Sequence, residues 1–255
     1  MSEKKQTLDN YTPANTLDIL LKLHIKPKPK KVILLYGPSM VGKSFLATLI
    51  ARDYLNGEGL AIYYGSEPHY ADEDYKALIT SQLRAKAYIN YTPYAKDVFQ
   101  AMNKLYSLKD DPPKKLVLIL DSLSMIAQRE AKKFYAKGIT ESRVIAARVV
   151  PLLNAISTEF KEKCIEYNAL GIMITHAGST AGSGKYRGVA ELKPSMSMRT
   201  AHNVDYILLL DLAPYSQSAD LKEKRRLTVV ASRYMPGIEG KHIDFSFEEL
   251  ERGKK

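Results

Sequence analysis

The chain has 255 residues, of which 45% are hydrophobic and 26% charged, a balance typical of one globular domain and unlike that of a disordered or fibrous protein. No apolar run approaches the ~18 residues that a membrane span needs, and the first residues lack the apolar stretch of a signal peptide. The single cysteine, Cys164, excludes an internal disulfide, so we expect a soluble cytoplasmic protein that does not contact a membrane.

Basic residues outnumber acidic ones by 38 to 28, which gives a formal net charge of +10. Such a charge favours a polyanionic partner such as nucleic acid, because each phosphate contact releases counterions. A lysine-rich, well-solvated surface would give the same charge. Composition alone therefore leaves both interpretations open.

Residues 1–30 are expected to form a basic tail with one short amphipathic helix near residues 16–21. The Lys-Pro run at residues 26–30 is too rich in proline to continue that helix. From residue 31 onward, short apolar runs alternate with helical stretches, and no internal repeat interrupts the pattern. We therefore expect one folded domain over residues 31–255.

Five apolar runs predict buried strands. They are residues 32–36, 60–64, 116–120, 171–175 and 204–210. Short, continuously apolar strands between helical stretches indicate a mostly parallel sheet with helices on both faces, which is an α/β fold. Two further strands, at residues 227–231 and 242–246, are joined by a glycine-containing turn without a helix. These two strands are expected to add antiparallel edges at the C-terminal end of the sheet.

A long helical stretch is expected between the third and fourth of these strands. Its apolar residues fall on one face at helical spacing: Ile145, Val149, Leu152, Leu153, Ile156, Phe160 and Cys164. Pro151 lies inside this stretch and is expected to kink or divide the helix, because proline removes a backbone donor and clashes with the preceding turn.

A glycine-rich segment between the first strand and the following helix has the spacing of a phosphate-binding loop. The segment reads Gly37-Pro38-Ser39-Met40-Val41-Gly42-Lys43-Ser44, and Phe45 follows it. Glycines let successive backbone N–H groups point inward, and the helix N-terminus adds its positive end. We expect ATP phosphates to contact this segment, Lys43 to reach the β- and γ-phosphates, and the Ser44 hydroxyl to bind Mg²⁺.

Three polar residues at strand ends could complete an ATPase site. Asp121 ends the third strand and is expected to hold Mg²⁺ through water. Glu67 follows the second strand and could orient or deprotonate the attacking water. His176 ends the fourth strand and could contact the γ-phosphate. Position alone leaves open that Glu67 is a surface glutamate and that His176 is structural.

In this order, the elements resemble the ATPase core of the RecA/RadA recombinases, from about residue 15 to residue 253. The segment from Tyr63 to Glu67, Tyr-Tyr-Gly-Ser-Glu, resembles the family strand that ends in the catalytic acid. Residues 118–122 resemble its Walker B strand with the trailing serine. The resemblance implies a RecA-like fold, ATP and Mg²⁺ as cofactors, and Glu67 as the catalytic base.

Two segments resemble the DNA-binding loops of the family. Residues 135–143, Tyr-Ala-Lys-Gly followed by a helix start, resemble the first loop and make Lys137 and Arg143 candidate DNA contacts. Residues 175–194 resemble the strand end and second loop. That segment is rich in glycine, and its candidate DNA contacts are Lys185, Arg187 and Lys193.

The chain also departs from strand-exchange recombinases. It has His176 where they carry Gln, Ser-Met at residues 195–196 where they carry Gly-Gly, and no N-terminal helix-hairpin-helix domain. It thus resembles a core-only archaeal RadA paralogue, which implies weak, DNA-modulated ATP hydrolysis and assistance to recombinational repair. The implied partners are single-stranded DNA, a RadA-type recombinase, and further subunits in a homo- or hetero-oligomer.

Two other classes remain open from the sequence. One is a signalling or scaffold ATPase, resembling the KaiC branch of the same superfamily, which need not bind DNA. The other is a nucleotide-binding module that barely hydrolyses ATP and serves as a partner subunit. DNA binding and ATP turnover distinguish these two classes from the recombination accessory protein.

Overall fold

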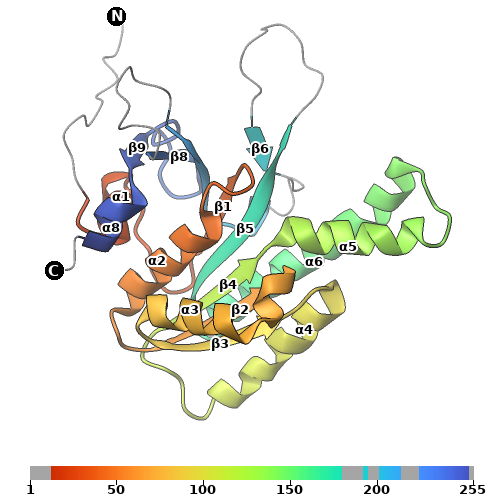
Figure 1. Ribbon diagram of the computed structural model, residues 1–255, viewed down its shortest axis with the longest axis horizontal. Helices are drawn as coiled ribbons and strands as arrows, with labels where there is room; N and C mark the ends of the chain where they lie inside the picture. The colour runs from red at the N-terminus through yellow and green to blue at the C-terminus, as the bar shows by residue number, and fades with distance from the viewer. Residues whose placement is uncertain (1–12, 180–191, 195–200, 214–223, 253–255) are drawn as a thin grey trace, which may run out of the picture.

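The computed structural model describes residues 13–179, 192–194, 201–213 and 224–252. Figure 1 shows a central twisted sheet flanked by helices, with one helical hairpin that extends away from it. Among the described residues, no helix combines the length and the apolar character that crossing a membrane requires.

Within the described residues the sheet has nine strands, and most of them are parallel. The strands are β1 (Val32–Gly37), β2 (Leu60–Gly65), β3 (Lys86–Tyr91), β4 (Leu116–Asp121), β5 (Leu170–Ser179), β6 (Leu192–Pro194), β7 (Tyr206–Leu212), β8 (Arg225–Ser232) and β9 (His242–Phe245). Their order is β3-β2-β4-β5-β1-β7-β8-β9, with β6 paired to β5. All pairs from β3 to β7 are parallel, whereas β8, β9 and β6 are antiparallel to their neighbours. The predicted α/β fold with antiparallel C-terminal strands is confirmed.

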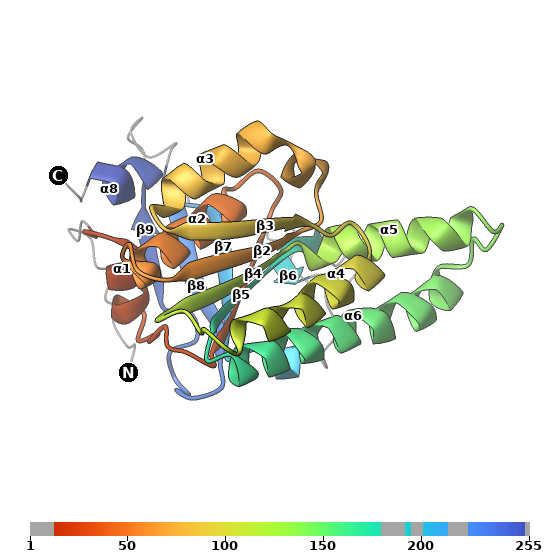
Figure 2. The ribbon, with the colours of Figure 1, turned by 90° about the horizontal axis from the view of Figure 1, so that it is seen from below.

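Helices cover both faces of this sheet (Figure 2). The helices are α1 (Thr16–Lys22), α2 (Lys43–Leu55), α3 (Glu73–Leu83), α4 (Ala95–Asn103), α5 (Leu123–Tyr135), α6 (Ser142–Glu166) and α8 (Phe247–Arg252), with short 3₁₀ turns η1 (Pro68–Ala71) and η2 (Lys104–Leu108). Alternate residues of β1 point to opposite faces, so Ile33 packs with α1, α2 and α3, while Leu34 packs with α4, α5 and α6. Both faces are buried, which explains why the strands are continuously apolar.

Helix α1 packs directly on α2. The Thr16 backbone N–H and hydroxyl both donate to Asp53 Oδ2, at 2.8 and 2.7 Å. Ile19 and Leu20 are fully buried in the same core as the α2 side chains. The expected short helix near residues 16–21 is therefore present and contributes to the core.

Helix α6 carries the predicted apolar face. All of the predicted residues are buried except Leu152, which is partly buried. Pro151 lies inside α6 without dividing it, because its exposed position leaves the freed carbonyl one turn earlier accessible to water. Of the two expected effects, a kink or a division of the helix, the division does not occur.

The first part of α6 and the end of α5 form a helical arm that extends past the sheet (Figures 1 and 2). The helices meet at residues 136–141, where Gly138 has φ +77° and allows the left-handed turn. Tyr135 and Lys137 are exposed at this end of the arm. The hydrophobic periodicity predicted one long helical stretch and did not show that α5 and α6 are separate helices. The resemblance to the first DNA-binding loop of the recombinases did predict a loop at this position.

Candidate active site

The phosphate-binding loop follows β1 and leads into α2. Gly42 is the N-cap of α2 with φ +98°, and no described side chain caps this helix start. The first N–H groups of α2 are therefore available to an anion, and the helix dipole favours negative charge at this end. Met40 has φ +63° and is almost fully exposed at the tip of the loop.

Two glycines of the loop are required by close packing. A Cβ at Gly37 would lie 2.0 Å from the Leu210 carbonyl oxygen on β7, and a Cβ at Gly42 would lie 2.5 Å from the Phe247 ring on α8. Phe247 also packs edge-on against Phe45, with ring centroids 4.9 Å apart. The loop is thus held by the C-terminal strands and helix, which lie far from it in the sequence.

The Lys43 side chain turns back over the loop. Its Nζ donates to the carbonyl oxygens of Gly37 and Pro38, at 3.1 and 2.5 Å. Burial lowers the pKa of the Lys43 ammonium, and the charges of Asp121 and Glu67 partly oppose that shift. A buried cation at an uncapped helix start fits the phosphates of ATP. Their charged oxygens would replace the two neutral carbonyls as hydrogen-bond acceptors for the Lys43 ammonium.

Asp121 lies fully buried at the end of β4. Its Oδ2 accepts a hydrogen bond of 2.6 Å from the Tyr70 hydroxyl, and its carboxyl also bonds with the Ser44 side chain. Burial raises the pKa of Asp121. A carboxylate beside the hydroxyl of Ser44 fits Mg²⁺, which keeps much of its water and takes one or two protein oxygens next to phosphates.

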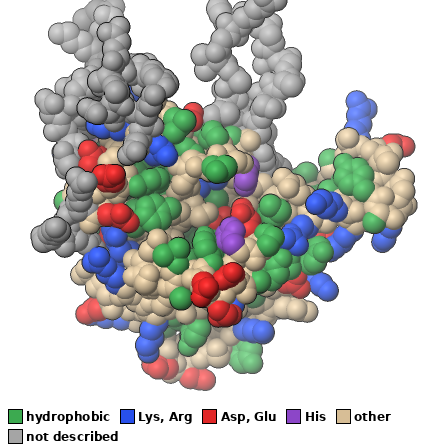
Figure 3. All heavy atoms as spheres, viewed as in Figure 1, with side chains coloured by type: hydrophobic (Ala, Val, Ile, Leu, Met, Phe, Trp, Pro, Cys, Tyr) green, Lys and Arg blue, Asp and Glu red, His purple; other side chains and the backbone are tan. Residues whose placement is uncertain are grey.

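Glu67 lies between two histidines just past β2. Its Oε2 is 3.6 Å from His69 Nδ1, and its Oε1 is 3.9 Å from His176 Nε2. His176 is the main cause that lowers the pKa of Glu67, with His69 and Lys43 adding to it. Figure 3 shows two histidine side chains on this face with acidic atoms between them. Glu67 is therefore ionised at neutral pH and can accept a hydrogen bond from water.

His176 connects Glu67 to the phosphate loop. It pairs with Gly37 in the parallel β1–β5 register, and its Nδ1 is 3.1 Å from Ser39 Oγ. Its backbone N–H donates to Ser124 Oγ at the start of α5. His176 thus contacts the loop that would hold phosphates and the carboxylate that would orient water, from the strand that leads toward residues 180–191.

Sequence reasoning missed two residues of this site, His69 and Tyr70. Both lie in the η1 turn that follows Glu67, and Tyr70 is fully buried against Tyr75 and Tyr63. The only signal was Pro68, which favours a tight turn directly after the strand. Nothing in the residue types indicated that this turn would fold back onto Asp121.

The candidate DNA contacts lie in different parts of the chain. Lys137 and Arg143 are exposed on the arm, at the end of α5 and the start of α6. Lys193 lies in β6, where it pairs with Gly178 of β5. Lys185 and Arg187 fall outside the described residues. The structure therefore places three of the five candidates.

Comparison with protein-family models gave no match, and no curated protein matched the sequence. Solved structures do match the fold. An ATPase domain of another protein superposes with a TM-score of 0.59 at 13% identity, over 94% of this chain and 89% of that one. The RadB recombinase superposes with a TM-score of 0.53 at 20% identity, over 94% of this chain and 97% of that one. This chain has a RecA-like fold.

The RecA-like fold explains why distant residues meet at one edge of the sheet. Lys43 and Glu67 follow β1 and β2, whereas Asp121 ends β4 and His176 lies on β5. All four strands are parallel. Ligands of open α/β sheets bind outside the carboxyl ends of the strands. The four candidate residues therefore converge where a nucleotide site is expected.

Asp121→Asn is expected to raise the unfolding temperature of the nucleotide-free protein at neutral pH. Because burial raises the pKa of Asp121, the folded state holds a carboxylate that the unfolded chain solvates better. Asparagine keeps the shape without the charge. Wild-type Asp121 becomes protonated as the pH falls toward 3.8, its ordinary pKa, so the difference between the proteins should shrink.

Calorimetric unfolding at neutral and acidic pH measures this difference. Asp110→Asn is the matched control, because Asp110 is exposed and its replacement should leave the unfolding temperature nearly unchanged. An Asp121→Asn protein that unfolds below the wild type at neutral pH would contradict the conclusion that burial of the Asp121 carboxylate destabilises the nucleotide-free fold.

Proposed function

We propose that this protein is an ATPase that binds single-stranded DNA and assists homologous recombination and repair. The observation that carries the ATPase part is the convergence of Lys43, Glu67 and Asp121 at the carboxyl end of a RecA-like sheet. The loop from Gly37 to Phe45 holds ATP, and Ser44 and Asp121 hold Mg²⁺.

The bound ATP supplies the phosphoryl group that water accepts, and Mg²⁺ neutralises part of its charge. Lys43 binds the phosphates through its ammonium, and the first N–H groups of α2 add to this contact. Glu67 orients the attacking water. Its low pKa suits positioning more than complete proton removal, because a weakly basic carboxylate holds a proton poorly. His176 couples the phosphate loop to Glu67 and serves as the reporter of nucleotide state.

DNA binding is proposed on the arm and on the segment after β5. Lys137 and Arg143 are exposed there, and the described residues place no carboxylate within salt-bridge distance of either. Both cations are therefore free to contact phosphates. Lys193, in β6 beside the strand that carries His176, is proposed as a further DNA contact, together with Lys185 and Arg187, which lie outside the described residues.

A role as a recombination accessory protein is supported by one structural relative. The RadB recombinase aligns over nearly its whole length, so the two chains share a core of the same size. We propose a RadA paralogue that acts with a RadA-type recombinase and joins further subunits as a homo- or hetero-oligomer in the cytoplasm. The other matched structure is an ATPase domain, which supports the ATPase part of this proposal.

Replacing Lys137 and Arg143 together by alanine is expected to weaken binding of single-stranded DNA roughly tenfold at low salt. Each phosphate contact on a single strand contributes about 0.7 to the slope of log affinity against log salt, so the slope should fall by about 1.4. Fluorescence anisotropy of a labelled oligothymidylate over a salt series measures both quantities.

Lys104→Ala provides the matched control, because Lys104 is exposed on η2, far from the arm. Unchanged affinity and slope in the double variant would remove the arm from the DNA site. If the wild-type protein binds no oligonucleotide at low salt, the DNA-binding proposal fails and the KaiC-like alternative, a signalling or scaffold ATPase, takes its place.

A further inference from the structure

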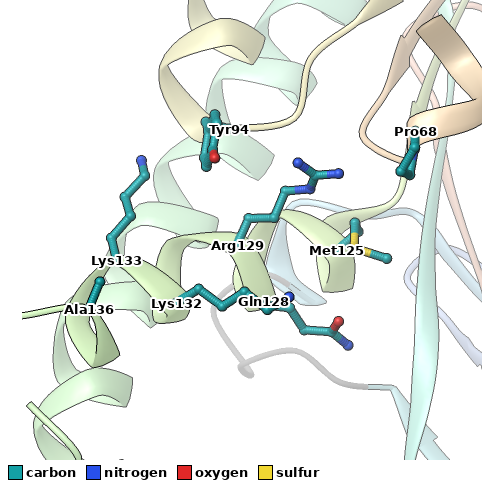
Figure 4. Close-up of a pocket in the computed structure, with 8 residues that line it drawn as sticks. All are labelled: Pro68, Tyr94, Met125, Gln128, Arg129, Lys132, Lys133 and Ala136. Atoms are coloured by element: carbon teal, nitrogen blue, oxygen red, sulfur yellow. The ribbon is translucent and has the colours of Figure 1, made fainter.

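A pocket of about 530 Å³ lies next to Pro68, the residue after Glu67; it is outside the phosphate loop and reaches the first predicted DNA loop only at Ala136. It is formed by the η1 turn, the start of α4 and the outer face of α5 (Figure 4). Its volume falls in the range typical of small-ligand sites. The residues that give it its chemistry are Pro68, Tyr94, Met125, Arg129, Lys132 and Lys133.

The pocket carries uncompensated positive charge. Lys133 is neutralised by Glu130, at 2.8 Å, and Glu130 also accepts from the Ala95 backbone N–H. Arg129 and Lys132, in contrast, have no carboxylate within salt-bridge distance among the described residues. The Arg129 Nε atom is buried, and the residues that the structure describes offer it no hydrogen-bond acceptor. A buried donor without an acceptor is costly, so an anionic ligand would stabilise this site.

Aromatic rings lie beside these cations. The Arg129 guanidinium is 5.9 Å from the ring centroids of both Tyr91 and Tyr94, and the Lys133 ammonium is 4.3 Å from that of Tyr94. In Figure 4, Arg129 extends from α5 toward the side of the pocket formed by Tyr94 and Pro68. Cations combined with aromatic faces are the arrangement by which proteins hold single-stranded nucleic acid.

The pocket also links two functional segments. Ala136, at the end of α5, lines one end of it and directly precedes Lys137 on the arm. Pro68 lines it from η1 and directly follows Glu67. A ligand that fills the pocket therefore lies between the proposed DNA contacts and the proposed catalytic carboxylate.

We propose that this pocket binds one nucleotide unit of a single-stranded nucleic acid, with a phosphate against Arg129 and Lys132 and a base against Tyr94. This inference rests on the proposed function, because it continues the DNA path from the arm. It adds a contact between the nucleic-acid strand and Pro68. Through this contact, binding of the nucleic acid would act on the position of Glu67. An isolated mononucleotide shares the same chemistry, and the experiment separates the two sources.

Tyr94→Trp provides a direct reporter, because the chain contains no tryptophan. Titration of the full-length variant with oligothymidylate, without ATP, should quench the emission of Trp saturably as a base stacks on the indole. Thymidine monophosphate should give no quenching over the same range of nucleotide concentration. Equal quenching by the mononucleotide would overturn the assignment to a strand.

A second measurement does not depend on position 94. Arg129→Gln with Lys132→Gln should weaken binding of labelled oligothymidylate roughly tenfold and lower the salt slope by about 1.4, as expected for two phosphate contacts on a single strand. Lys104→Gln is the control at the far end of α4, and it should bind as the wild type does.

The outcomes distinguish this inference from the proposed function. Wild-type protein that binds no oligonucleotide contradicts both. Suppose that the wild-type protein binds the oligonucleotide and the Lys137 and Arg143 variant binds it more weakly. If the Arg129 and Lys132 variant and the Trp emission are then unaffected, the pocket alone is contradicted. A weakened Arg129 and Lys132 variant together with strand-specific quenching supports the pocket.

Discussion

Glu67→Gln is expected to lower ATP turnover at least roughly 100-fold while nucleotide binding stays near the wild-type level, because a positioned acid–base group typically contributes a factor of 10² to 10⁴. Glutamine keeps the length of the side chain, but its neutral amide has one acceptor oxygen in place of two charged ones, so it orients the water less well beside His69 and His176. Phosphate release measures turnover, and binding of a fluorescent ATP analogue measures affinity. Turnover near the wild-type rate would move the catalytic role to another residue.

Glu73→Gln is the matched control for this change. Glu73 lies six positions later at the start of α3, where its side chain is 83% exposed and, in the part of the chain that the structure describes, pairs only with Lys76. The same chemical change there removes one surface ion pair and should leave turnover within about twofold, because such pairs contribute little. A similar loss in both variants would point to a general effect on the domain.

Lys43→Ala is expected to weaken ATP binding roughly 100-fold, because charge-assisted hydrogen bonds to phosphate contribute about 1.5 to 3 kcal/mol each. The variant should fold normally. In the nucleotide-free protein the ammonium is buried against two neutral carbonyls, and its burial lowers the pKa, so its removal relieves a desolvation cost. Calorimetric titration with ATP and Mg²⁺ measures the affinity.

Thermal unfolding without nucleotide separates the two effects of this substitution. An unfolding temperature at or above that of the wild type, with ATP affinity lost, assigns Lys43 to the phosphates. An affinity equal to that of the wild type would remove the loop from Gly37 to Phe45 as the nucleotide site, whatever the fold.

The central strands could be predicted because of where they lie in the sheet. Strands β1, β2, β4 and β5 have helices on both faces, so each contains a buried run of apolar residues that stands out in the sequence. Strand β3 lies at the edge, where Lys86 and Tyr88 are exposed, and its mixed sequence carries no such signal. Strand β6 is only three residues long and depends on its pairing with β5.

The candidate site could be predicted only in part. Lys43, Asp121 and Glu67 follow apolar strands, so parallel topology alone brings them to one edge. The contacts of Glu67 with His69 and of Asp121 with Tyr70 depend on the path of the η1 turn, which residue types do not determine. The pocket on α5 could not be predicted, because it depends on where the arm leaves the domain.

ATP hydrolysis at the proposed site is expected to respond to single-stranded DNA. The most direct measurement is the rate of phosphate release by the wild-type protein with and without oligothymidylate, with Lys43→Ala as the background. We expect slow release that rises when the oligonucleotide is added and is absent in Lys43→Ala. Release that is the same with and without the strand, or that persists in Lys43→Ala, would contradict this expectation.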